Sequence, residues 1–186
     1  MKKYRNYSLK KHRQDNPRTG STDLFFGLTA ALLGIVLSLT STPAAALGLS
    51  CNVSATGVAF GNYNPTNGAP TDATGNVHVF CTVLLVSVGA QTNISLNKGG
   101  SGSFVPRKMS SGANQLNYNL YKEASHITVW GDGTGGTGIF TDNTTIAVLG
   151  TSIDHTIYGR IPAGQYVAAG SYADTITVTV EFHEGL

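Results

Sequence analysis

The sequence has little of what long helices require. The chain has 186 residues, and no stretch of it repeats apolar residues at the three- to four-residue spacing of a long amphipathic helix. The part after residue 46 is rich in Gly, Thr, Ser, Asn and Val, and poor in Lys, Glu and Leu. This composition favours strands and turns. We therefore expect an all-β protein.

Positive charge is also scarce outside the first 46 residues. The whole chain has 12 Lys and Arg against 10 Asp and Glu, a formal charge of +2. Seven of the basic residues and two of the acidic ones precede residue 47, which leaves 12 − 7 = 5 basic and 10 − 2 = 8 acidic residues, or −3. A chain with no basic patch is poorly suited to the phosphate backbone. Nucleic acid is therefore excluded as an expected partner.

Recognised catalytic and metal-binding patterns are lacking as well. The glycine-rich stretch Gly131–Gly138 has no lysine after its last glycine and only one carboxylate, so it matches neither a phosphate loop nor a calcium loop. His78, His126, His155 and His183 do not have zinc-motif spacing, and no G-x-S-x-G elbow is present. We expect no enzyme activity, cofactor or metal.

The first 46 residues have the order of a secretory signal peptide. A basic region, residues 1–23, precedes an uncharged apolar run of 16 residues, 24–39, and then Ala44, Ala45 and Ala46. We predict cleavage after Ala46 and an exported domain, 47–186, with no membrane partner after cleavage. The alternative is an uncleaved anchor, which typically has about 20 apolar residues.

Two cysteines lie in the exported part, where oxidation is favoured. Cys51 and Cys81 allow one pairing, and no His or carboxylate flanks either of them at metal-site spacing. The pairing would close a loop of about 30 residues, which stabilises a fold by roughly 3–4 kcal/mol in the chain-entropy model. We predict a structural disulfide.

Short strand candidates separated by turn residues predict a sandwich or barrel. The last of them, Thr175–Phe182, alternates strictly between apolar and polar residues, and only residues 183–186 follow it. A half-buried strand needs a neighbour on each side or a protected edge. A central position for this strand would therefore require a neighbour from another chain. The other candidates are 53–60, 77–86, 92–97, 115–121, 127–130, 144–149 and 153–161.

Six segments in order resemble the spore coat protein U domain family. They are Cys51–Pro65 (CNVSATGVAFGNYNP), Met109–Gly112, Leu116–Tyr121, Val129–Gly133, Tyr158–Gln165 and Ala169–Val180. The resemblance implies an incomplete immunoglobulin-like β-sandwich that lacks its last strand and is completed by a donor strand. It also implies a non-enzymatic structural or adhesive subunit of a surface fibre, which a periplasmic chaperone and an outer-membrane usher assemble with neighbouring subunits.

Strand addition requires an apolar groove with walls of fixed register. We expect one wall to contain Ile176, Val178 and Val180. The opposite wall would contain Val53, Val58 and Phe60 of the first strand.

The predicted mature N-terminus is shorter than that expected of a polymerising subunit. After cleavage at Ala46 only residues 47–50 precede Cys51. They span at most roughly 14 Å, which is shorter than a strand of about five or six residues. We therefore expect a subunit that accepts a strand without donating one, at a fibre tip or as an accessory. The alternatives are a free-standing secreted coat or matrix domain and a secreted carbohydrate-binding or hydrolytic β-sandwich.

Overall fold

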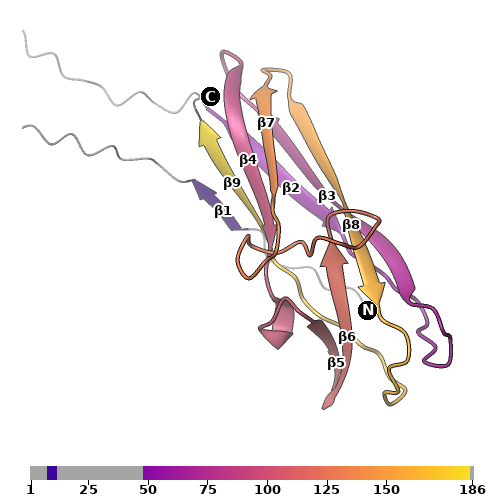
Figure 1. Cartoon of the computed structure of the whole chain (residues 1–186). Coiled ribbons are helices and arrows are strands. Elements are labelled where there is room, and N and C mark those ends of the chain that lie inside the picture. Colours follow the sequence, from indigo (N-terminus) through magenta and orange to yellow (C-terminus); the bar gives the residue numbers. More distant parts are fainter. Residues whose placement is uncertain (1–7, 12–47, 185–186) are drawn as a thin grey trace, which may run out of the picture.

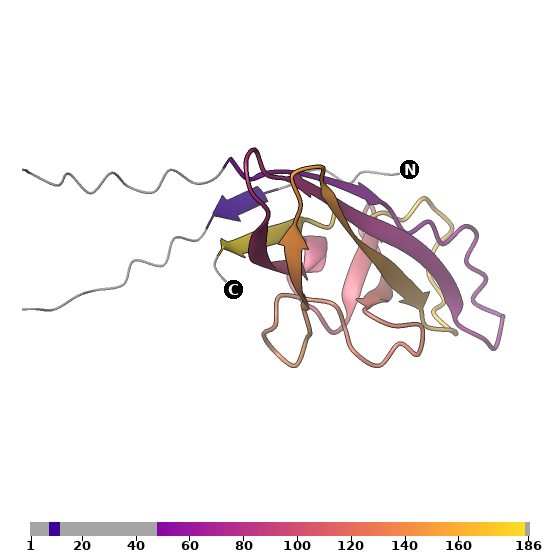
Figure 2. The same ribbon diagram turned by 90° about the horizontal axis from the view of Figure 1, so that it is seen from above.

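Two β-sheets packed face to face form the domain (Figures 1 and 2). The computed structural model describes residues 8–11 and 48–184. Sheet A has the strand order β1-β9-β4-β7 and sheet B the order β2-β3-β8-β6-β5. The strands are β1 (Ser8–Lys11), β2 (Ser50–Thr56), β3 (Thr71–Thr82), β4 (Val88–Leu96), β5 (Arg107–Ser111), β6 (Asn114–Tyr121), β7 (Phe140–Ile146), β8 (Thr151–Ile161) and β9 (Val178–Glu184).

The all-β prediction is confirmed. Within the described ranges the only helical element is one 3-10 turn, η1 (Gly99–Ser101). Every strand pair is antiparallel except β1 with β9, which is parallel. Antiparallel sheets with one face on the core explain the alternating residue pattern of the strands.

The last strand begins later than the sequence pattern predicts. β9 starts at Val178 instead of Thr175, because the chain before it is engaged elsewhere. Ala173 pairs with Ser110 of β5, at the edge of sheet B, and the chain then crosses to sheet A. The expected alternation is confirmed, since Ile176, Val178 and Val180 are buried.

The predicted disulfide is present. Cys51 of β2 and Cys81 of β3 are bonded, and they are direct partners in the antiparallel register. β3, which contains most of the predicted strand 77–86, lies between β2 and β8. The disulfide therefore fastens the edge strand β2 to the middle of sheet B.

A buried arginine links several segments of the chain at the end of sheet A. Arg107 of β5 is fully buried and donates to Asn97 O at 2.8 and 3.1 Å, to Trp130 O at 2.7 Å and to Asn119 Oδ1 at 2.9 Å. Its guanidinium lies 5.1 Å from the centre of the Phe104 ring. A buried charge is tolerated when it is fully hydrogen-bonded. These bonds join the end of β4, strand β6 and the chain around residue 130.

The Arg107→Met substitution should therefore destabilise the domain strongly. It removes the donors of two buried acceptors, Asn119 Oδ1 and Trp130 O, and of the part-buried Asn97 O. Breaking such a polar cluster costs about 3–5 kcal/mol. The neighbouring Lys108→Met substitution removes one exposed bond to Gln115 and should change stability by no more than about 0.5 kcal/mol. Urea unfolding of both variants measures the difference, and equal midpoints would contradict this account of Arg107.

Candidate strand-acceptor groove

Sheet B extends beyond sheet A at one end, and a cavity of about 1080 Å³ lies there. Its floor comes from the inner face of β5, β6 and the end of β8. Two segments without regular structure, 57–65 and 167–174, provide its walls. The apolar floor side chains are Met109, Leu116, Tyr118, Leu120 and Ile161.

The first wall sits directly on the sheet because Gly159 has no side chain. A Cβ at Gly159 would lie 2.6 Å from Val58 Cγ1 and 2.8 Å from Phe60 Cζ, distances that real Cβ atoms do not adopt. Phe60 also packs edge-to-face on Tyr118, with ring centres 6.0 Å apart. Tyr63 holds the far end of this wall, since its hydroxyl donates to Pro162 O at 3.0 Å and accepts from Gln165 N at 2.8 Å.

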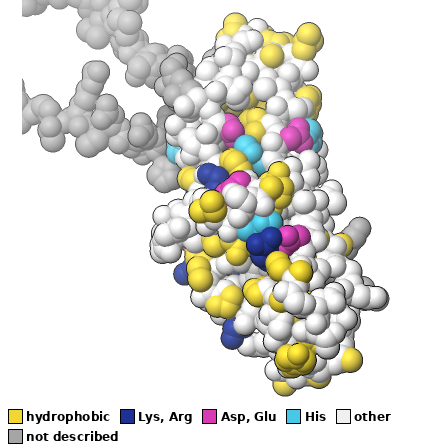
Figure 3. Space-filling model, turned by 45° about the vertical axis from the view of Figure 1, so that its right-hand side comes forward, with side chains coloured by type: hydrophobic (Ala, Val, Ile, Leu, Met, Phe, Trp, Pro, Cys, Tyr) yellow, Lys and Arg dark blue, Asp and Glu magenta, His cyan; other side chains and the backbone are white. Residues whose placement is uncertain are grey.

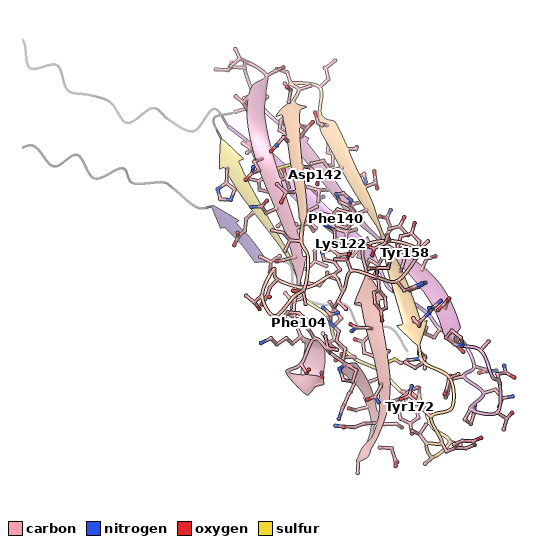
Figure 4. The ribbon with its side chains drawn as sticks, viewed as in Figure 1. Phe104, Lys122, Phe140, Asp142, Tyr158 and Tyr172 are labelled. Carbon is pink, nitrogen blue, oxygen red and sulfur yellow. A yellow bond between two sulfur atoms is a disulfide. The ribbon has the colours of Figure 1, made fainter. Side chains whose placement is uncertain are left out.

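The second wall is held mainly by Asp174. Its carboxylate accepts from Tyr118 Oη at 2.7 Å and from Gly100 N at 2.8 Å. Two backbone bonds between Ala173 and Ser110, of 2.9 and 3.1 Å, attach the wall to β5. Tyr172 lies beside β5 and β6 (Figure 4), and its hydroxyl donates to Ala168 O at 2.7 Å. The walls are therefore fixed independently of anything that fills the cavity.

The second wall leads into the edge of sheet A. After residue 177 the same stretch of chain becomes β9, which pairs with β4 on one side and with β1 on the other. The β1 register runs from Ser8 opposite Thr179 to Lys11 opposite Phe182. β1 belongs to the region predicted to be a signal peptide, and cleavage after Ala46 stays a prediction. A β9 edge without β1 would have unpaired backbone groups and could accept another strand.

The six predicted groove residues fall into two groups. Val58 and Phe60 line the cavity. Val53, Ile176, Val178 and Val180 are buried in the core between the sheets. The role of all six as a donor-strand groove stays a prediction.

Sequence reasoning did not identify the cavity floor or the second wall. In the predicted strand 115–121, Leu116, Tyr118 and Leu120 alternate with asparagines, and this pattern correctly predicts an inward face. Alternation does not tell whether an inward face is covered by a sheet or left open. The backbone bridge at Ala173, which places the second wall, has no sequence signal.

The charged side chains near the middle of the molecule are paired with one another. His155 Nε2 lies 2.7 Å from Asp142 Oδ2, and the His155 ring stacks on Phe140 at 3.7 Å (Figure 4). A hydrogen bond with His78, 2.8 Å long, lowers the pKa of Asp154. In the same way the hydrogen bonds from Arg160, 2.7 Å long, lower the pKa of Asp72. The His155–Asp142 contact joins β8 to β7 across the two sheets, and the other two contacts join the neighbouring strands β3 and β8.

Neither a cluster of candidate metal ligands nor a membrane-spanning helix occurs in the described residues. Among residues 8–11 and 48–184, no three His, Cys, Asp or Glu side chains are grouped closely enough to hold a metal ion. No helix in those ranges is long and apolar enough to cross a membrane.

Comparison with known proteins assigns the family. The model of the Spore Coat Protein U domain matches residues 36–179. The chain belongs to the Spore Coat Protein U domain family. A curated relative, Protein U of Myxococcus xanthus, is 34% identical over 136 residues, which cover 66% of this chain and 70% of that protein. The resemblance noted from the sequence segments is confirmed.

Two solved structures of pilus proteins are also similar. One is the CsuC–CsuE chaperone–tip adhesion subunit pre-assembly complex from the archaic chaperone-usher Csu pili of Acinetobacter baumannii. The match is 26% identical with a TM-score of 0.46, and covers 72% of this chain but only 39% of that chain. The other is the E. coli Hda pilus minor tip subunit, HdaB, at 14% identity and a TM-score of 0.31, covering 69% and 79% of the two chains. The family assignment rests on the first comparison.

The Tyr63→Phe substitution tests how the first wall is held. It removes the acceptor of the Gln165 amide, a bond worth about 1 kcal/mol, so this amide should exchange with solvent roughly fivefold faster. Tyr166→Phe is the control, since Tyr166 is 78% exposed. Hydrogen exchange resolved at single amides measures the exchange rate of the Gln165 amide in both variants. Unchanged protection of Gln165 would show that the wall does not depend on Tyr63.

Proposed function

We propose that this protein is a non-enzymatic structural or adhesive subunit of a surface fibre, and that another chain completes its fold by adding a strand. The chaperone–usher route that the family resemblance implies supplies the partners: a periplasmic chaperone first, then a neighbouring subunit at an usher. The protein is exported and ends at the cell surface.

The observation that carries this proposal is the apolar cavity whose second wall, residues 167–174, leads into β9. Buried alternate residues of β9 form part of the core, while the floor from β5, β6 and β8 has no sheet opposite it. A strand that paired with β9 and continued past Val178 along the second wall would bring its side chains to the cavity. This is the geometry of β-strand addition.

The pairing of β1 supports the same proposal in a second way. A segment far away in sequence forms a four-residue ladder on β9 without disturbing the antiparallel β4 pairing on its other side. The edge is therefore sterically and chemically competent to receive a strand. A self-closing coat or matrix domain is the rival, and it would require no other chain at this edge.

A charge in the cavity should block assembly. Val167 lines the cavity and is half-buried, so a Val167→Asp carboxylate would be desolvated by an incoming strand at a cost of several kcal/mol. We expect surface fibre carrying this subunit to fall at least about tenfold. The control is Ile127→Asp, at a position 79% exposed and outside the cavity lining. Immunolabelling of whole producing cells measures both variants.

A second measurement, of solubility with and without a chaperone, distinguishes the fibre subunit from a self-closing coat or matrix domain. The exported protein is produced in a host without fibre genes, with and without the candidate chaperone. We expect aggregation or degradation without the chaperone, because the apolar wall side chains Val58, Phe60 and Val167 are only half-buried while no strand covers them. A soluble monomer that unfolds cooperatively without help, with Val167→Asp behaving like the original protein, would establish the free-standing domain instead.

The proposed place in the fibre is the tip or an accessory position, because the predicted mature chain has no donor segment. Mass spectrometry of the protein recovered from cells gives its first residue. We expect a start within a few residues of Leu47. A start many residues earlier would provide a donor segment, and would replace the tip position with one inside the fibre.

A further inference from the structure

The end of the molecule opposite the cavity carries a group of exposed apolar side chains. Two turns form it, residues 83–87 between β3 and β4 and residues 147–150 between β7 and β8. Leu84, Leu85 and Leu149 are 74%, 77% and 95% exposed. We call these two turns the apolar pole; they also carry Val86 and Val148, both exposed.

The strand register places the two turns side by side. Cys81 at the end of β3 pairs with Thr151 at the start of β8, and Val88 at the start of β4 pairs with Ile146 at the end of β7. Both turns therefore cross between the sheets at the same end of the sandwich. Figure 1 shows them together at the top, and Figure 3 shows hydrophobic side chains there with no charged side chain among them.

The shape and chemistry of the pole limit what it can contact. It is made of the tips of two turns, and none of its residues lines the cavity described above. No residue in 79–91 or 143–153 is charged, so it offers no ion pair to a protein partner. Exposed leucines at turn tips gain little from packing in the free domain, and they gain most by entering an apolar phase.

The position of the N-terminal apolar run relative to the pole indicates that this apolar phase is a lipid bilayer. A Cβ at Gly48 would lie 2.4 Å from Leu84 Cδ1, so the described domain begins at this pole. Only eight residues, 40–47, separate the apolar run 24–39 from Gly48, a distance of at most roughly 30 Å. When that run lies in a bilayer during export, the pole is held at the bilayer surface.

We propose that the apolar pole binds lipid bilayers, by inserting the leucines of its two turns among the acyl chains. The contact is peripheral and driven by apolar burial, so it is independent of lipid charge. It adds a partner that the sequence-based expectation of no membrane contact after cleavage did not include. It does not depend on strand addition, because the cavity lies at the other end of β8.

Flotation with vesicles tests the proposal. The exported protein, collected from the cells that make it, is mixed with phosphatidylcholine vesicles at low and at high salt. We expect binding at both salt concentrations. The Leu84→Ser/Leu85→Ser/Leu149→Ser variant should bind at least about tenfold more weakly, since each tenfold corresponds to 1.4 kcal/mol and three leucine side chains lose their apolar contact.

The matched control is Ile127→Ser/Tyr166→Ser, which removes two equally exposed apolar side chains, 79% and 78%, outside the pole. It should bind like the original protein, and thermal unfolding by circular dichroism should show that both variants are folded. Two binding results would overturn the proposal: equal vesicle binding by the triple variant, or binding only to anionic vesicles at low salt. Two others would as well: adsorption to polystyrene without vesicle binding, or a dimer of the original protein that becomes a monomer in the triple variant.

Discussion

The inner face of sheet B is longer than the sheet that covers it, and most of the structure follows from this mismatch. Sheet A covers β3 and β8 near their Cys81 and Thr151 ends only. Beyond it, apolar side chains of β5 and β6 need another cover, because exposed apolar area costs about 25 cal/mol per Å². The segments 57–65 and 167–174 provide part of this cover, and the remainder is the cavity.

Arg107 lies at the boundary between the covered and the open part. Its acceptor Asn97 follows directly after β4, and the Asn97 amide in turn donates to Thr177 O at 3.0 Å, just before β9. The buried guanidinium therefore fixes the two strands of sheet A at the place where they stop. It keeps the boundary in one position, since a hydrogen-bonded charge cannot shift without losing several bonds at once.

The sequence predicted those features that local pattern determines. Period-two alternation identified the buried residues of β9, and the cysteine count and compartment identified the disulfide. β5 was missed because Arg107-Lys108 reads as polar, and only the assembled fold buries the arginine. The role of Gly159 could not be predicted for a related reason. Gly159 lets Val58 and Phe60 pack against β8, and this contact joins residues about 100 positions apart in the sequence.

The same limit applies to the site. Val178 and Val180 have one alternation pattern whether their neighbour strand comes from the same chain or from another. The alternation of apolar and polar residues therefore predicts that a strand is half-buried. The strand pairing seen in the structure is needed to learn which segment lies at its edge. Here the register shows β1 at that edge, a segment that no periodicity in residues 8–11 would have suggested.

The two ends of the domain have separate chemistry. β8, from Thr151 at the apolar pole to Ile161 at the cavity, spans about 33 Å at the usual rise per residue. A bilayer-spanning run 24–39 would put residues 8–11 and residue 48 on opposite sides of the membrane. β1 would then have to leave β9. If 24–39 is the signal peptide that the sequence predicts, the proposed export would leave the β9 edge free for a partner strand while the pole is still beside the bilayer.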